Sequence, residues 1–214
     1  MRKINVHLRF IDEALGTSSA NKEIYSDYIA SKAPDAATKE DEVASFGAEA
    51  VAEKGTTVFQ RLEDGTPYMY DYQVKGAFKE ACGMLRRATG TKSSKVKAFK
   101  KEIDGLVFVS PRRIRLAIPE GSEMGVCERP LRAATPQGER IALARSETVP
   151  AGTTMDFSVT CLNDATVPVL VEWLQYFRLH GLSQWRNAGK GRAVVTVSEG
   201  GKVIYDNTDL DEDV

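Results

Sequence analysis

Strict alternation of apolar and polar residues marks the start of the chain, in the stretch KINVHLRF (3–10). One side of this stretch carries Ile4, Val6, Leu8 and Phe10, and the other carries Lys3, Asn5, His7 and Arg9. A period of two residues predicts a β-strand that is buried on one face and open on the other. The open face suits contact with nucleic acid, and an ordinary solvated face is the alternative.

The rest of the chain alternates between strands and two amphipathic helices. Further strands are expected at 57–62, 67–72, 106–109, 155–161, 192–198 and 202–205, and the helices at 72–87 and 166–180. Strand runs separated by helices predict an α+β protein with a mainly antiparallel sheet backed by helices. We therefore expect a ferredoxin-like (RRM-like) β-α-β-β-α-β core with insertions.

A single domain spanning residues 1–214 is expected, with three additions to the core. These are a helical insertion at 21–54, an extended thumb-like loop at 120–150 and an acidic tail at 206–214. The loop assignment rests on the lack of a clear helix or strand period between Glu120 and Pro150. A loop of that length in a compact domain is usually functional or disordered.

The net charge of −1 conceals a strong segregation of charge along the chain. Asp35 to Glu53 holds six acidic residues and one lysine, whereas Asp71 to Lys101 holds nine Lys/Arg and two acidic residues. Segregated charge bears on the choice of partners, not on the fold. A polyanion suits the basic segment, and mutual neutralisation of the two segments is the alternative.

Several functional classes lack their sequence signals. There is no run of eighteen apolar residues and no apolar signal-peptide core, so we expect a protein of the bacterial or phage-infected host cytosol that does not contact a membrane. The three distant cysteines, Cys82, Cys127 and Cys161, are expected to be reduced thiols. No metal-spaced His/Cys set, Walker loop or G-x-S-x-G motif is present, and we expect no metal and no cofactor.

Two glycine-bearing segments are candidates for contact with phosphates. Residues 173–192, WLQYFRLHGLSQWRNAGKGR, contain three glycines, four Lys/Arg and no acidic residue. Backbone amides flanked by cations favour anionic oxygens, although a helix cap followed by a turn is the plainer interpretation. In the other segment, Lys75 and Gly76 are expected at a helix start, where unpaired amides attract anions, and Arg86 at its end.

These segments resemble motifs of the RAMP superfamily, the RNA-binding subunits of CRISPR effector complexes. VKGAFKEACGMLRR resembles its "SxLKGALR" helix start, although Tyr72-Gln73 stands where small residues are usual. GLSQWRNAGKGR resembles its glycine-rich signature, and residues 128–160 resemble the arginine-bearing loop of type III backbone subunits. The order of the three features agrees with the family. The chain also has the general look of a phage or prophage protein.

The resemblance implies a palm-shaped domain that binds single-stranded RNA along its backbone and stacks side by side with other subunits. The residues that it places at phosphates, in the glycine-rich loop or in the thumb are Lys75, Gly76, Arg86, Arg132, Arg140, Arg145, Gly181, Gly189, Lys190, Gly191 and Arg192. Arg186, within the glycine-rich segment, joins them as a candidate cation. Single-stranded DNA is the other ligand considered, and the expected partners are further copies of the chain or a multi-subunit nucleoprotein complex.

Catalysis is a weaker expectation than binding. Some relatives cut RNA with a histidine and others with a loop aspartate, and this chain has only His7 and His180. His7, beside Arg9 on the open strand face, is the candidate for a metal-independent ribonuclease, with a surface hydrogen-bonding role as the alternative. His180 precedes Gly181 at a helix end, where capping suffices. No motif selects an aspartate. A protein-interaction or decoy role, motivated by the acidic segments, is the remaining hypothesis.

Overall fold

The computed structural model describes the chain at residues 1–20, 56–135 and 138–210. The chain divides into two compact units. The first unit comprises Met1–Ala14, Gln60–Glu123 and Val149–Val214, and the second comprises Leu15–Phe59 and Met124–Thr148. The boundaries of domains expected from the sequence stay a prediction, and each unit is described below by itself.

A five-stranded antiparallel sheet forms the centre of the first unit, in the order β13-β12-β1-β11-β7. Its strands are β1 (Arg2–Phe10), β7 (Val107–Ser110), β11 (Thr154–Cys161), β12 (Ala193–Glu199) and β13 (Lys202–Asp206). The alternation of β1 is confirmed, because its four apolar side chains are at most 2% exposed. These side chains therefore define the buried face of the sheet.

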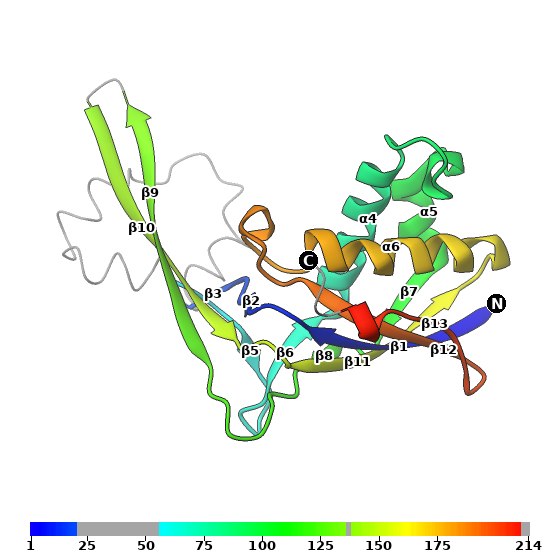
Figure 1. Ribbon diagram of the computed structural model, residues 1–214, viewed down its shortest axis with the longest axis horizontal. Coiled ribbons are helices and arrows are strands. Elements are labelled where there is room, and N and C mark those ends of the chain that lie inside the picture. The colour runs from blue at the N-terminus through cyan, green and yellow to red at the C-terminus, as the bar shows by residue number, and fades with distance from the viewer. Residues whose placement is uncertain (21–55, 136–137, 211–214) are drawn as a thin grey trace. The chain divides into compact units, whose positions relative to one another are not determined.

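Three helices cover that face: α4 (Asp71–Leu85), α5 (Phe99–Leu106) and α6 (Val167–His180) (Figure 1). The ring of Phe78 on α4 lies 5.8 Å from the rings of both Trp173 and Phe177 on α6, centroid to centroid. The sequence β1-α4-β7-β11-α6-β12 is a β-α-β-β-α-β series, and β1 lies between β12 and β11. The ferredoxin-like α+β fold is thus confirmed.

A three-stranded sheet adjoins α4 in the chain and consists of β5 (Gln60–Arg61), β6 (Pro67–Tyr70) and β8 (Arg113–Arg115). The expected hairpin between the first two strands is present, with antiparallel pairing. Its second strand ends two residues earlier than expected, because Asp71 begins α4. The amide of Tyr70 donates to Gln73 Oε1 at 2.7 Å, which caps the helix there.

The expectation of an irregular loop at 120–150 is wrong for most of that range. Instead, β9 (Gly125–Thr135) and β10 (Gly138–Val149) form two paired antiparallel strands. Strand pairing is made by backbone groups, so it forms without the apolar alternation by which a strand is recognised in a sequence. Helix α5, which lies in the basic segment before β7, is a further element that the sequence pattern does not predict.

The second unit contains this hairpin and three short strands. They are β2 (Ala14–Leu15), β3 (Ser18–Ser19) and β4 (Thr57–Val58), in the sheet order β2-β10-β4-β3. Thr57 Oγ1 and Ser146 Oγ lie 2.7 Å apart, and the amide of Phe59 donates to Glu147 Oε2 at 2.9 Å. Side-chain hydrogen bonds therefore tie β4 and the residue after it to β10.

Two expected additions lie wholly or partly outside the described residues. The helical insertion at 21–54 is entirely outside them. Of the acidic tail, Asp206 ends β13 and Thr208–Leu210 form a short 3-10 helix, so only 211–214 remain undescribed.

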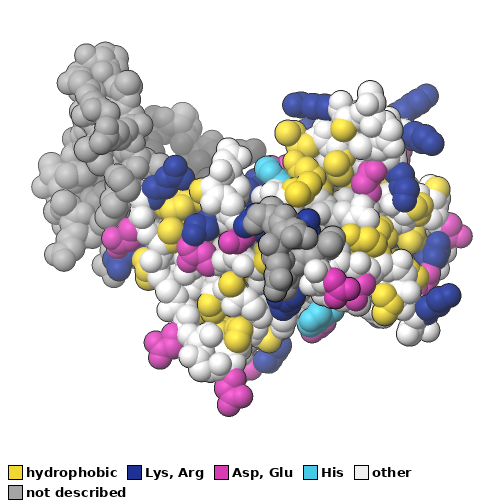
Figure 2. Space-filling model, viewed as in Figure 1, with side chains coloured by type: hydrophobic (Ala, Val, Ile, Leu, Met, Phe, Trp, Pro, Cys, Tyr) yellow, Lys and Arg dark blue, Asp and Glu magenta, His cyan; other side chains and the backbone are white. Residues whose placement is uncertain are grey.

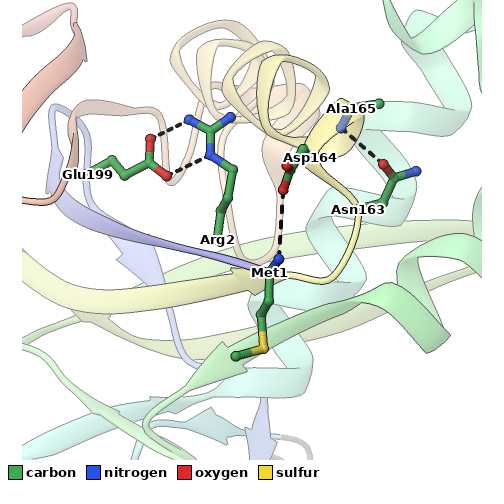
Figure 3. A network of polar contacts seen from close by, with 6 residues as sticks. All are labelled: Met1, Arg2, Asn163, Asp164, Ala165 and Glu199. Atoms are coloured by element: carbon green, nitrogen blue, oxygen red, sulfur yellow. Dashed lines mark hydrogen bonds and ion pairs between the residues drawn. The ribbon is translucent and has the colours of Figure 1, made fainter.

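The start of β1 is held by charged groups on the helix-covered side of the sheet (Figure 3). Arg2 Nε lies 2.6 Å from Glu199 Oε1, and the Met1 amino group lies 3.8 Å from Asp164 Oδ1. The hydrogen bond from Arg2 holds the pKa of the Glu199 carboxyl below its ordinary value. These interactions connect β1 to the end of β12 and to the segment before α6.

Candidate nucleic-acid interface

The face of the main sheet opposite the helices is polar. On β1, Lys3, Asn5 and His7 are exposed and Arg9 is half-buried. In the strand register, Asn5 lies opposite Ser158 and Ser198, and His7 lies opposite Asp156 and Thr196. A shallow groove on this face is lined by the backbone or side chains of Lys3, Asn5, Val6, His7, Ser110, Pro111, Asp156, Phe157, Ser158, Thr196 and Ser198.

His7 is paired across two neighbouring strands of this open face. Its Nδ1 lies 2.8 Å from Asp156 Oδ1, and the side chains of both residues remain substantially exposed, at 47% and 77%. A carboxylate at one ring nitrogen orients the imidazole and favours a proton on Nδ1. The three sequence-predicted residues of the sheet face, Asn5, His7 and Arg9, thus lie on one surface of the first unit.

The glycine-rich segment folds back on itself after α6. The Leu182 amide donates to the Gly191 carbonyl at 2.8 Å, and the Gly191 amide donates to the Glu13 carbonyl at 2.8 Å. Gly181 and Gly191 both have positive φ, and a Cβ on either would lie within 2.4 Å of a backbone oxygen. Close packing of the chain on itself therefore requires these two glycines, whatever else the loop touches.

Both cations at the end of this loop are engaged by carboxylates. Lys190 Nζ contacts Glu13 Oε1, and Arg192 Nε donates to Asp12 Oδ2 at 2.6 Å. The four side chains are only 21–33% exposed. The sequence pattern predicts that Lys190 and Arg192 are available to bind an anion. In the structure they instead belong to a partly buried ionic network. A phosphate would compete with Asp12 and Glu13 for them.

Arg186 is also paired, through a residue of α4. Its guanidinium contacts one oxygen of Glu80, and His180 Nε2 lies 3.1 Å from the other oxygen. Gly189, with φ of 79°, has space around its Cα because the nearest atom to an added Cβ would be Arg192 Nε at 3.9 Å. Of the three glycines, Gly189 is thus the one that leaves backbone accessible.

The helix-start candidates lie further into α4 than expected. Lys75 and Gly76 are the fifth and sixth residues of the helix, so they do not carry the unpaired amides of its first turn. Lys75 Nζ donates to the Asp104 carbonyl at 2.9 Å, and partial burial lowers the pKa of this amine. Gly76 is exposed, and a Cβ there would meet no atom within 4 Å.

Arg86 follows α4, at the basic end of the helix pair. Its guanidinium lies 5.0 Å from the centroid of the Phe99 ring, and its Nε is buried without a hydrogen-bond partner among the described residues. A groove beside it is lined by Gly76, Lys79, Glu80, Gly83, Met84, Arg86, Arg87, Phe99 and Lys100. Lys and Arg side chains project from this end of the first unit in Figure 2.

The three arginines expected in the thumb lie on the β9–β10 hairpin of the second unit. Arg132 is on β9, paired in register with Ile141, and Arg140 is on β10, paired with Ala133. Arg145 Nε lies 3.0 Å from Glu128 Oε1, which faces it across the two strands. The predicted binding residues therefore fall in different compact units. Those of the glycine-rich loop and the sheet face belong to the first unit, and those of the hairpin belong to the second.

Sequence reasoning missed the carboxylates that engage the predicted cations. Asp12 and Glu13 are separated from Arg192 and Lys190 by 180 and 177 residues, and Asp156 is 149 residues from His7. No local pattern in the sequence marks such partners. Only the adjacency of β1, β11 and β12 brings them together.

The cysteines of the main sheet and its helices are buried. Cys82 and Cys161 are free thiols, and burial raises the pKa of both, that of Cys161 to about 11. In the described part of the chain no group of three or more His, Cys, Asp or Glu side chains is placed to hold a metal ion. The helices described here are too short or too polar to cross a membrane.

Comparisons with known proteins agree with the fold. No protein-family model and no curated protein matches the sequence. Among solved structures, a chain of the type III-B Cmr-beta structure bound to cognate target RNA matches 92% of this chain with a TM-score of 0.54 and 10% identity. The chain resembles a CRISPR effector subunit in fold. The RAMP-like resemblance expected from the motifs is thereby confirmed at the level of fold.

The lengths of the matched chains differ. This protein covers 61% of the Cmr-beta chain, so about two fifths of that chain have no counterpart here. A chain of a type IV-B CRISPR complex is matched over 97% of this protein and 96% of its own length, with 15% identity and a TM-score of 0.46.

Proposed function

We propose that this protein binds single-stranded nucleic acid, RNA in preference to DNA, along its backbone and without cleaving it. The observation that carries the proposal is the polar face of a ferredoxin-like sheet, on which Lys3, Asn5 and His7 are exposed, in a fold shared with a chain of a structure bound to RNA. Lys3 and Arg9 supply cations on this face, and Asn5 supplies an amide. Such groups bind phosphates and sugars with little dependence on base sequence.

The glycine-rich loop supports the proposal in a second way. Lys190 and Arg192 lie close to Gly189, which is half-buried and has open space at its Cα, and the phosphates of a nucleic acid can displace Asp12 and Glu13 from them. Within the first unit, the further proposed contacts are Lys75, Gly76, Arg86 and Arg186 around α4. Within the second unit, they are Arg132, Arg140 and Arg145 of the hairpin. A cytosolic location, in a bacterium or a phage-infected host, is also part of the proposal.

The experiment is a titration of fluorescein-labelled single-stranded RNA and DNA, followed by anisotropy at several salt concentrations. Binding to RNA that weakens with salt supports the proposal, and absence of binding to either strand at low salt overturns it. Lys3→Glu should weaken binding and reduce the salt slope by roughly 0.7 for each phosphate that the variant no longer neutralises. Lys190→Glu with Arg192→Glu tests the loop, with thermal melting to check that this variant folds.

Lys202→Glu is the matched control for Lys3→Glu. Lys202 is exposed on β13 opposite Glu199, which in turn lies opposite Ile4, so it belongs to the helix side of the sheet. The same change of charge there should leave RNA binding almost unaltered. Equal decreases in affinity from both variants would mean that net charge, and not the open face, determines affinity.

Side-by-side assembly along the strand is a further part of the proposal. Sedimentation velocity with RNA of increasing length should show stepwise addition of protein copies. One protein per strand at every length would restrict the function to that of a single binding module.

A ribonuclease is the second candidate function, favoured by the contact between His7 and Asp156. The carboxylate at Nδ1 leaves Nε2 as the nitrogen for proton transfer in the open groove. Incubation of the protein with RNA in a chelator should then give cleavage that His7→Ala abolishes. Cleavage unchanged in His7→Ala removes this residue from the mechanism.

A further inference from the structure

Three tyrosines gather where β6 meets α4. Tyr68 and Tyr70 are in edge-to-face contact, with centroids 5.0 Å apart and a hydroxyl–hydroxyl hydrogen bond of 2.9 Å. Tyr72 continues the group, because its ring is stacked on Tyr70 at 5.0 Å with an interplanar angle of 20°. The result is an ordered series of rings that begins inside the protein and ends at its surface.

Burial decreases sharply along this series. Tyr68 is 6% exposed and Tyr72 is 47% exposed. A tyrosine that served only to cover the sheet would bury its ring, as Tyr68 does. Tyr72 instead keeps almost half of its surface in water, at a cost in apolar burial that a ligand would recover.

Arg112 completes the surface end of the stack. Its guanidinium carbon lies 5.6 Å from the Tyr70 centroid and 5.5 Å from the Tyr72 centroid. Arg112 is therefore almost equally distant from the two stacked rings and contacts both of them. Asp71 fixes the position of Arg112 through two contacts. Arg112 Nη1 lies 2.9 Å from Asp71 Oδ1, and the Asp71 amide donates to the Arg112 carbonyl at 3.1 Å.

A second pair of an exposed ring and a cation lies next along α4. Lys75 is one helical turn after Tyr72, and its Nζ lies 5.0 Å from the centroid of the Phe108 ring. Phe108 is 46% exposed on β7, opposite Thr160 in the register. Thr160 lies opposite Lys3 of β1, so Phe108 belongs to the open face of the sheet.

We propose that Tyr72 is a stacking platform for an unpaired base of a single-stranded nucleic acid, with Arg112 beside it for the adjoining phosphate. This inference rests on the proposed function and adds to it a contact with a base. Every base has a π-face, so such a platform accepts any base but requires it to be unpaired. Arg112 retains further N–H donors after its bond to Asp71, because a guanidinium has five.

The test uses a single-stranded RNA that carries 2-aminopurine, whose fluorescence is quenched when it stacks on an aromatic ring. Wild-type protein should quench the probe, Tyr72→Phe should preserve the quenching, and Tyr72→Ala should remove it and weaken binding by roughly 5- to 150-fold. Tyr176→Ala is the matched control. It also removes a stacked tyrosine, one whose ring lies 5.1 Å from that of His180 on α6, and should change neither signal.

A strand of the same length with abasic sites distinguishes the inference from the proposed function. If wild-type protein binds the normal and abasic strands equally, and Tyr72→Ala binds like wild type, stacking is overturned while backbone binding stands. If wild-type protein binds neither strand, both are overturned. If Tyr72→Ala fails to fold, Tyr72→Leu provides the same comparison because it keeps apolar contact with Tyr70 but has no ring.

Discussion

Gly191 and Leu182 hold the glycine-rich segment closed. The Leu182 amide donates to the Gly191 carbonyl at 2.8 Å, and a Cβ at position 191 would lie 1.8 Å from the Leu182 carbonyl oxygen. Gly181 makes a similar approach to the Lys190 carbonyl, at 2.4 Å from an added Cβ. The two ends of the loop are therefore locked together by backbone atoms, which places Lys190 and Arg192 close to the carboxylates that follow β1.

Gly191→Ala should destabilise the protein by on the order of 3 kcal/mol, because the new methyl group meets a backbone oxygen and the residue has φ of 72°. Gly189→Ala is the control, since it shares the positive φ but meets no atom closer than 3.9 Å. Its destabilisation should be about 1 kcal/mol. Chemical denaturation of both variants measures the difference, and equal destabilisation would mean that strain in φ, not the clash, determines the cost.

Asp12→Asn combined with Glu13→Gln should tighten RNA binding. Removing both carboxylate charges frees Lys190 and Arg192 to bind phosphates. Because the two ion pairs are partly exposed, the affinity for RNA should rise by roughly two- to fivefold. Anisotropy titrations at low salt measure the gain. Binding that is unchanged in a variant with normal thermal melting would show that these cations do not contact the nucleic acid.

Glu199→Gln should lower stability at neutral pH and not at acid pH. The hydrogen bond from Arg2 lowers the pKa of Glu199 in the folded state, so the carboxylate contributes stability above the pKa of the unfolded chain. This contribution is lost as the pH falls through the folded-state pKa. Denaturation across pH 2–7 should therefore give a free energy of unfolding that is higher for wild type than for the variant at neutral pH. The difference should decrease as the pH falls below about 4.3, the pKa of an unperturbed Glu, and should vanish below the folded-state pKa of Glu199. Parallel curves would contradict a native Arg2–Glu199 pair.

Cys127 should be the first cysteine to react with iodoacetamide in the native protein. Cys82 and Cys161 are buried, and the raised pKa of each, about 11 for Cys161, keeps them as thiols at pH 8. Cys127 is half-buried. Peptide mapping by mass spectrometry before and after denaturation distinguishes the three sites. Native labelling of Cys161 as fast as that of Cys127 would contradict its burial.

Local periodicity was sufficient to predict the main elements of the first unit. The alternation of Ile4, Val6 and Leu8 corresponds to a strand buried on one face, and Phe78, Trp173 and Phe177 lie on the buried sides of the two expected helices. The strand pairings of β9 and β10 could not be predicted this way. Their backbone hydrogen bonds depend on the partner strand and leave no apolar period in the sequence.

Local residue patterns are enough to predict the fold class, the open face of β1 and the glycines of the loop, because burial and backbone conformation each restrict residue type locally. The pairing of charges in the candidate site, in contrast, follows from tertiary contacts and has no signal in the sequence. Lys190 and Arg192 pair with Glu13 and Asp12, and Arg186 and His180 share Glu80. Ion pairs between residues about a hundred or more positions apart are set by strand and helix adjacency. A charged residue looks the same in the sequence whether it is paired or available.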